Sequence, residues 1–158
     1  MIPSVGAPAP DFSLTWKVGQ PPVEPASFAD GEPLVVLFFP LAFSPVCTEE
    51  ICAVAGLWER WSSLGARVVG ISVDSPWVNV RFAEENAIPF PLLSDFNKDV
   101  ARAYGVLNDD YFGMRGVADR AAFVIDGDGR IAYVWHTEDD SILPDFEAIA
   151  EVVTRLKG

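Results

Sequence analysis

The sequence predicts an α/β domain in which helices flank a central mixed β-sheet on both faces. In the N-terminal half, apolar runs rich in β-branched residues alternate with segments that begin on helix-capping residues, the pattern of a strand-helix-strand-helix unit. Towards the C-terminus, two further apolar runs flank Asp126-Gly127-Asp128-Gly129, a turn typical of an antiparallel hairpin, and a helical segment follows. A parallel half joined to an antiparallel half makes a mixed sheet.

The first predicted strand and helix hold the residues of greatest chemical interest. Leu34–Phe39 is a continuous apolar run, as expected for a strand buried on both faces. Ser44-Pro45 then combines an N-cap residue with proline at the first helical position, and Glu49 and Glu50 suit the positive end of the helix dipole. The helix ends near Leu64-Gly65, and its apolar face is formed by Cys47, Ile51, Val54, Trp58 and Trp61.

The remaining elements follow in order along the chain. Arg67–Val73 predicts a second buried strand, and Asp74-Ser75-Pro76 caps a helix that runs to about Asn86. We further expect a short strand over Pro89–Leu93, a short helix over Asn97–Tyr104, strands over Ala121–Ile125 and Arg130–Trp135, and a final helix over Pro144–Leu156. Gly19–Pro25 is expected to be a surface loop. Since no linker or repeat divides the chain, residues 1–158 are predicted to form a single domain.

Composition excludes several classes of protein. Half of the residues are apolar and 22% are charged, which favours a globular domain over a disordered or fibrous chain. The longest apolar run, Pro33–Val46, is shorter than the roughly 18 to 20 residues of a membrane span, and the N-terminus lacks the pattern of a signal peptide. The net charge of −12 disfavours nucleic-acid and membrane partners. We therefore expect a cytoplasmic protein.

Cys47 is the first candidate for a reactive group. Its place in the first turn of a helix favours the thiolate over the thiol, because free backbone N–H groups and the positive dipole end stabilise the negative charge. Glu49 and Glu50 oppose this effect, since nearby negative charge raises the pKa of a thiol. An activated Cys47 therefore needs positive charge from elsewhere in the fold.

At this motif the chain resembles the peroxiredoxins. Pro40, Ser44 and Cys47 match a family signature of proline, threonine or serine four residues later, and cysteine three residues after that. The resemblance continues in the expected order through Gly6–Phe12, Val35–Phe39, Ile71–Asp74, Phe90–Asp95, Tyr104–Val106 and Arg120–Asp126. It implies a thioredoxin fold with a peroxiredoxin-type N-terminal extension.

The resemblance also implies a role for each matching residue. Cys47 would attack the terminal oxygen of a peroxide and become a sulfenic acid. Ser44, in place of the usual threonine, would hydrogen-bond the thiolate and the bound peroxide, and Pro40 would shield the site from water. Arg120 would supply the guanidinium that stabilises the thiolate, and Glu50 matches an acidic position that helps to hold this arginine. No cofactor is expected.

Cys52 decides between two mechanisms. In the bacterioferritin comigratory protein branch, or Q type, a resolving cysteine lies five residues after the peroxidatic one, and Cys52 fits this position. The resemblance then implies an intramolecular disulfide that thioredoxin or another dithiol reductant reduces. In a helix, however, five residues place two Cα atoms some 8 to 9 Å apart, beyond the ~7 Å limit for a disulfide. The helix start would have to unwind, or Cys52 is an apolar filler in a one-cysteine enzyme.

Two function classes follow from these residues. The first is a thiol peroxidase that reduces hydrogen peroxide and organic hydroperoxides. The second is a thioredoxin-like dithiol-disulfide oxidoreductase or a redox-sensing protein, but such proteins typically use C-x-x-C, whereas four residues separate Cys47 from Cys52. Less specific interpretations remain: Cys47 as a structural thiol, Arg120 in a surface salt bridge, and Glu50 as an acid favoured by the helix dipole.

The other polar motifs suggest no metal site. His136 is the only histidine and is expected at the partly exposed end of a strand. A zinc site would need two carboxylates besides His136 and the cysteines, and the Asp126–Gly129 turn lacks the remaining positions of a calcium loop. Phe43, Tyr111 and Phe112 would serve either a homodimer interface or a substrate rim, so both a monomer and a homodimer remain open.

Overall fold

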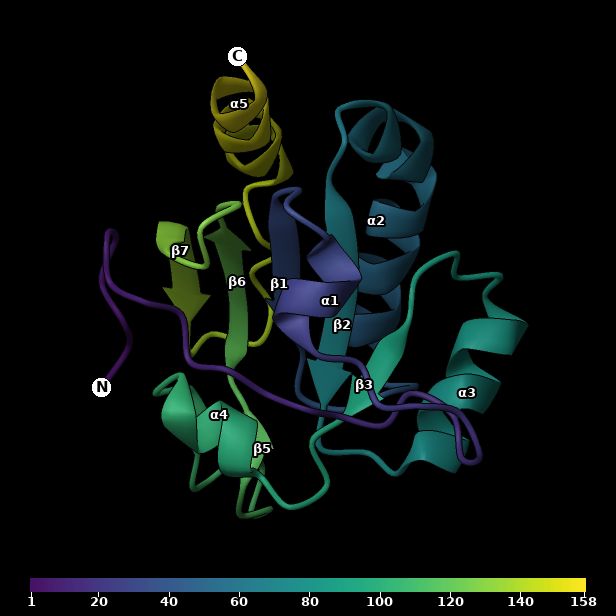
Figure 1. Ribbon diagram of the computed structural model, residues 1–158. Helices are drawn as coiled ribbons and strands as arrows, with labels where there is room; N and C mark the ends of the chain where they lie inside the picture. The colour runs from purple at the N-terminus through teal and green to yellow at the C-terminus, as the bar shows by residue number, and fades with distance from the viewer.

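Strand β1, Leu34–Phe38, is the central strand of a five-stranded sheet in the computed structural model, which describes residues 1–158 (Figure 1). The sheet has the order β3-β2-β1-β6-β7, with the other strands at Leu92–Ser94 (β3), Arg67–Ser72 (β2), Arg120–Ile125 (β6) and Ile131–Thr137 (β7). β1 pairs parallel with β2, and β2 pairs parallel with β3. β6 pairs antiparallel with both β1 and β7, which confirms the predicted mixed sheet.

Helices cover both faces of this sheet. They are α1 (Pro25–Ala29), α2 (Pro45–Ser63), α3 (Pro76–Glu85), α4 (Asp99–Ala103) and α5 (Phe146–Lys157). Alternate residues of β1 enter different cores, because successive strand side chains point to opposite faces. Val35 and Leu37 pack with residues of α2 and α5, whereas Val36 and Phe38 pack with residues of α4. None of the helices is at once long enough and apolar enough to cross a membrane.

Several element boundaries differ from the predicted ones. The third strand begins at Leu92 rather than Pro89, because the prolines at 89 and 91 carry no N–H for a ladder. The final helix begins at Phe146 rather than Pro144, where the Asp145 side chain caps it by accepting from Ala148 N at 3.0 Å. The sequence analysis did not predict α1 or the small sheet of β4 (Leu107–Asn108) and β5 (Val117–Ala118), because these elements are too short to show a periodicity.

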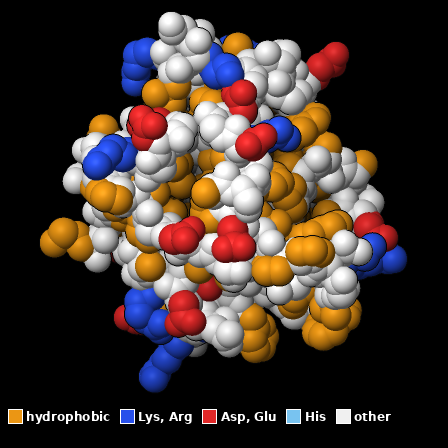
Figure 2. All heavy atoms as spheres, in the orientation of Figure 1, with side chains coloured by type: hydrophobic (Ala, Val, Ile, Leu, Met, Phe, Trp, Pro, Cys, Tyr) orange, Lys and Arg blue, Asp and Glu red, His pale blue; other side chains and the backbone are white.

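The pairing of β1 with β6 prepares a site at one edge of the sheet. β1 runs towards the start of α2, and its last residue, Phe38, pairs with Ala121 of the antiparallel strand. Arg120, the first residue of β6, therefore lies beside the segment that leads from β1 into α2. The surface around this framework carries acidic side chains that are spread over the face in view rather than gathered in one patch (Figure 2).

Candidate active site

The segment between β1 and α2 is held in a fixed conformation by neighbouring polar groups. Ala42 N donates to Asp74 Oδ2 at 2.8 Å, and the same carboxylate oxygen accepts from Ser72 Oγ at 2.8 Å. Phe43 adopts a φ of 69°, which is uncommon for a residue with a side chain. Its ring packs edge-on against Phe82 of α3, with centroids 5.1 Å apart. The turn before α2 is therefore held by hydrogen bonds next to β2 and by ring packing against α3.

Ser44 begins α2 as the sequence predicts, but its side chain does not cap the helix. Its backbone is extended, and Pro45 follows at the first helical position. Ser44 Oγ donates to Leu41 O at 3.0 Å, whereas Ser44 O accepts from Thr48 Oγ1 at 2.8 Å. The first-turn N–H groups are thus left without a side-chain acceptor from Ser44, which keeps them available to a negative charge near Cys47.

Cys47 is a free thiol with no solvent exposure. Burial raises the pKa of Cys47, and the Ser44 hydroxyl, Arg120 and the backbone at Leu41 oppose that effect. The helix terminus and the guanidinium therefore work against a strong desolvation penalty. This balance differs from the sequence expectation, in which the two neighbouring glutamates were the main opposition to the thiolate.

Arg120 supplies the positive charge that the sequence reading required. Its side chain is fully buried, and Nη2 lies 3.5 Å from Cys47 Sγ. Nη1 donates to Glu50 Oε1 at 2.7 Å, and Nη2 also donates to Asp140 Oδ1 at 2.7 Å and to Asp140 O at 3.1 Å. Burial alone would lower the pKa of Arg120, but the charges of Glu50 and Cys47 raise it. The guanidinium stays protonated beside the thiol.

Glu50 is the buried partner of this arginine. Both side chains are completely shielded from solvent, and Glu50 Oε2 and Arg120 Nε have no hydrogen-bond partner. Burial raises the pKa of Glu50 to about 7, although Arg120 pulls in the opposite direction. The carboxyl therefore gains a proton more easily in the folded chain than an exposed glutamate does.

The perturbed pKa of Glu50 makes the stability of the fold depend on pH. A carboxyl with a higher pKa in the folded chain binds protons preferentially there, so wild-type stability is lost as pH rises from 4.5 towards 7. Glu50→Gln removes this contribution, worth up to about 3 kcal/mol. Urea unfolding at pH 5 and pH 8 should show a smaller loss of stability in Glu50→Gln than in wild type. Glu49→Gln, an exposed neighbour, is the control; if both variants match wild type, the prediction is wrong.

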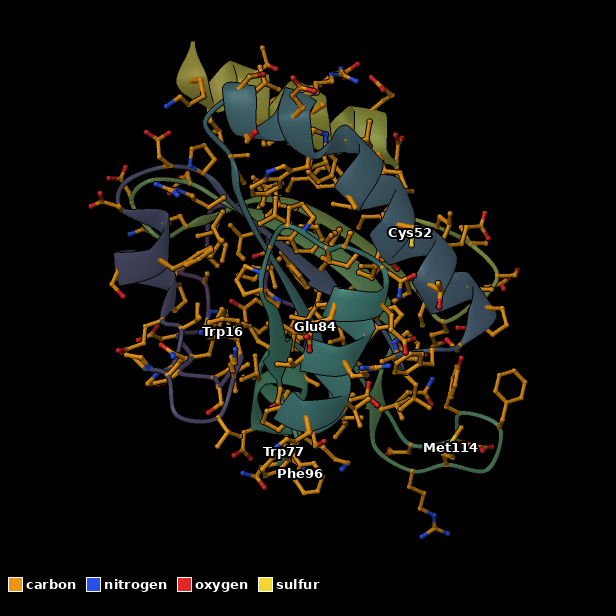
Figure 3. All side chains as sticks on the ribbon, turned by 90° about the vertical axis from the view of Figure 1, so that its right-hand side faces the viewer. Trp16, Cys52, Trp77, Glu84, Phe96 and Met114 are labelled. Carbon is orange, nitrogen blue, oxygen red and sulfur yellow. The ribbon has the colours of Figure 1, made fainter.

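Five of the six predicted site residues lie together, and one lies apart. Pro40 is buried beside the turn, and Ser44, Glu50 and Arg120 lie around the Cys47 thiol. Cys52 lies on the exposed side of α2 (Figure 3), where Sγ donates to Asn86 Oδ1 at 3.5 Å. Both cysteines are free and belong to one continuous helix.

Two residues at the site escaped the sequence reading of the mechanism. Asp140 comes from the segment between β7 and α5, and its place in the acidic run Glu138–Asp140 gives no signal that it contacts Arg120. Tyr111, between β4 and β5, was predicted to serve a homodimer interface or a substrate rim, with no role in the reaction. Burial, together with the adjacent charge of Asp140, raises the pKa of Tyr111. Asp140 and Tyr111, both partly exposed, therefore extend the polar network around Cys47 towards the surface.

His136 has a structural contact next to the site. Its Nε2 lies 2.9 Å from Asp119 Oδ2, and Asp119 Oδ1 accepts from Asn108 Nδ2 at 2.7 Å. These bonds tie β7 to the residue before Arg120 and to β4. Asp126 forms the expected turn, since its Oδ1 accepts from the backbone N–H groups of Asp128 and Arg130.

Comparison with known proteins decides the family. Residues 5–134 match the model of the AhpC/TSA family. The chain belongs to this family. It is 36% identical over 157 residues to a Coxiella burnetii protein that bears the name peroxiredoxin bcp, covering 96% of this chain and 97% of the relative. It is 35% identical over 133 residues to chloroplastic peroxiredoxin Q of Sedum lineare, covering 84% of this chain and 69% of the relative.

The fold of this peroxiredoxin agrees with a solved structure. The crystal structure of peroxidoxin BcpB from Mycobacterium tuberculosis superposes with a TM-score of 0.83 at 30% identity, covering 97% of each chain. The predicted thioredoxin fold is confirmed, as is the predicted enzyme class, a thiol peroxidase and hence an oxidoreductase.

Proposed function

We propose that Cys47 is the peroxidatic cysteine of this enzyme. The single observation that carries the proposal is the contact of 3.5 Å between Arg120 Nη2 and Cys47 Sγ at the start of α2. The Cys47 thiolate attacks the terminal oxygen of hydrogen peroxide or an organic hydroperoxide. A sulfur–oxygen bond forms, the oxygen–oxygen bond breaks, and the leaving oxygen takes up a proton to depart as water or alcohol. Arg120 stabilises both the thiolate and the charge on the leaving oxygen.

The surrounding residues would act on the same step. The Ser44 hydroxyl, which already favours the thiolate by lowering the pKa of Cys47, would redirect its hydrogen from Leu41 O to the sulfur or the bound peroxide. Pro40 has no N–H and is buried at the turn, so it would keep water from the thiolate. Glu50 would hold Arg120 through Nη1. The complete burial of Cys47 favours a small substrate over a protein disulfide, which argues against the dithiol oxidoreductase alternative.

Cys52 would then resolve the sulfenic acid. Its thiolate would attack the sulfur of the Cys47 sulfenic acid, a disulfide would form, and the hydroxyl group would leave as water after protonation. Thioredoxin or another dithiol reductant would restore both thiols. Since the two residues lie five apart in an unbroken helix, the first turns of α2 must unwind before the sulfurs can meet.

The packing of α2 suggests which part of it unwinds. Its C-terminal half is held by Trp61 against Phe146, with ring centroids 6.2 Å apart, and by Trp58 against Phe90, at 5.9 Å. Its N-terminal half begins at an exposed proline, Pro45. Unwinding from Pro45 would break the Glu50–Arg120 bond, so the resolving step has to disrupt the arrangement that serves the first step.

Mass spectrometry distinguishes the two mechanisms. After one equivalent of hydrogen peroxide, the wild-type chain should carry an intramolecular disulfide between Cys47 and Cys52. Cys52→Ser should instead accumulate a sulfenic acid at Cys47 that a dimedone probe captures, with little change in the rate of the first oxidation. A trappable sulfenic acid of equal lifetime in wild type and Cys52→Ser would assign the chain to the one-cysteine mechanism.

We infer a cytoplasmic enzyme whose substrate is a peroxide and whose partner is a dithiol reductant, working as a monomer or a homodimer. The net charge of −12 supports the absence of nucleic-acid partners, because phosphate backbones are repelled.

A further inference from the structure

Arg120 is held from both ends of its guanidinium. Glu50 of α2 occupies Nη1, whereas Asp140, from the segment between β7 and α5, occupies Nη2 with its carboxylate at 2.7 Å and its carbonyl at 3.1 Å. The same Nη2 is the nitrogen that faces Cys47 Sγ. Asp140 therefore bonds Nη2, the nitrogen that contacts the Cys47 sulfur, whereas Glu50 bonds only Nη1.

This arrangement places two carboxyl groups and a phenol around one cation. The groups that face Cys47 and Arg120 are Glu50 from α2, Asp140 from the segment before α5 and Tyr111 from the β4–β5 connection. Since Asp140 Oδ1 and Cys47 Sγ both bond Nη2, they lie no more than about 6 Å apart. A carboxylate so close to the sulfur disfavours a second negative charge there, so Asp140 orients Arg120 while making the Cys47 thiolate harder to form.

We propose that Asp140 is a positioning residue of the peroxide-reducing site, which fixes Nη2 of Arg120 opposite Cys47; this rests on the proposed role of Cys47. Asp140 lies outside α2, so it keeps its hold on Arg120 when the start of the helix unwinds and Glu50 departs. Without Asp140, the buried positive charge of Arg120 would have no carboxylate partner while the start of α2 is unwound.

Two substitutions separate the orienting effect from the charge. Asp140→Asn keeps an oxygen acceptor for Nη2 but removes the negative charge, whereas Asp140→Ala removes both side-chain effects. Glu138→Gln is the matched control, because it removes one charge from an exposed residue of the same segment. Near-ultraviolet circular dichroism verifies folding, and Asp140→Asn, which is nearly isosteric, carries the test if the alanine variant fails to fold.

Two readouts are measured on each reduced protein. Thiolate absorbance, with the same variant carrying Cys47→Ser subtracted, gives the titration midpoint of Cys47, and stopped-flow mixing with hydrogen peroxide gives the limiting oxidation rate at high pH. We expect Asp140→Asn to lower the midpoint by roughly one pH unit and to keep the limiting rate within about threefold. Asp140→Ala should lower the limiting rate roughly tenfold or more.

The outcomes are distinguishable from failure of the proposed function. An unchanged or raised midpoint in Asp140→Asn, or an alanine variant as fast as Glu138→Gln, contradicts the role of Asp140. If wild type shows no oxidation that depends on Cys47, the proposed function fails, but the titration midpoint still decides whether Asp140 acts on Cys47.

Discussion

Cys47→Ser is expected to abolish peroxide reduction, with a rate at least about 10⁴-fold below that of wild type. A serine hydroxyl stays protonated near neutral pH and is a far weaker nucleophile than a thiolate. The fold should persist, because serine is close to cysteine in size and the site already contains hydrogen-bonding groups such as Ser44 and Arg120. The measurement is peroxide consumption with a small dithiol as reductant.

The control for this loss is the second cysteine. Cys52→Ser removes a thiol from the exposed side of the same helix, and it should retain the first oxidation step. If Cys52→Ser loses this step while Cys47→Ser keeps it, the roles of the two cysteines are reversed and the proposal is wrong.

Arg120 substitutions are expected to have the next largest effect. Arg120→Lys keeps a positive charge but cannot reach Glu50, Asp140 and Cys47 at once as the planar guanidinium does. The oxidation rate should fall by about 10² to 10³. At pH 8, above the pKa of about 7 of Glu50, Arg120→Met removes the positive charge and leaves the Glu50 carboxyl buried without a partner, which should also destabilise the fold by about 3 to 5 kcal/mol.

A double variant separates the two effects of Arg120→Met. Adding Glu50→Gln removes the buried negative charge, so stability measured by urea unfolding should recover while oxidation by peroxide stays slow. Arg115→Met, at an exposed arginine, is the matched control and should leave both quantities unchanged. Full recovery of the oxidation rate in the double variant would mean that Arg120 acts only on stability.

Local sequence signals predicted the part of the fold that holds the thiol. The apolar run of β1 and the Ser44-Pro45 start of α2 are properties of neighbouring residues, and both elements form where expected. The observed starts of β3 and α5 differ from the predicted ones by two or three residues. Prolines that cannot pair in a ladder delay β3, and the Asp145 cap fixes the start of α5. β4 and β5 contain two residues each, too few for a pattern of alternation.

The charges around Cys47 show the limit of sequence reading more clearly. Position in a helix predicts a stabilised thiolate, and the need for a cation could be stated from Glu49 and Glu50 alone. Arg120 was matched only through the family resemblance, since 73 positions separate it from Cys47. Asp140 was missed because its contact arises from the packing of an irregular segment. Burial of the sulfur, which dominates the pKa of Cys47, is likewise a property of the folded chain.

One measurement tests the central claim most directly. Stopped-flow tryptophan fluorescence, recorded after the reduced chain is mixed with stoichiometric hydrogen peroxide, follows the first oxidation before any reductant acts. Trp58 and Trp61 lie on the same helix as Cys47 and should report the change in its N-terminal part. A fast phase that exceeds the oxidation of free cysteine by several orders of magnitude and disappears in Cys47→Ser is the predicted result. Oxidation no faster than that of free cysteine would contradict it.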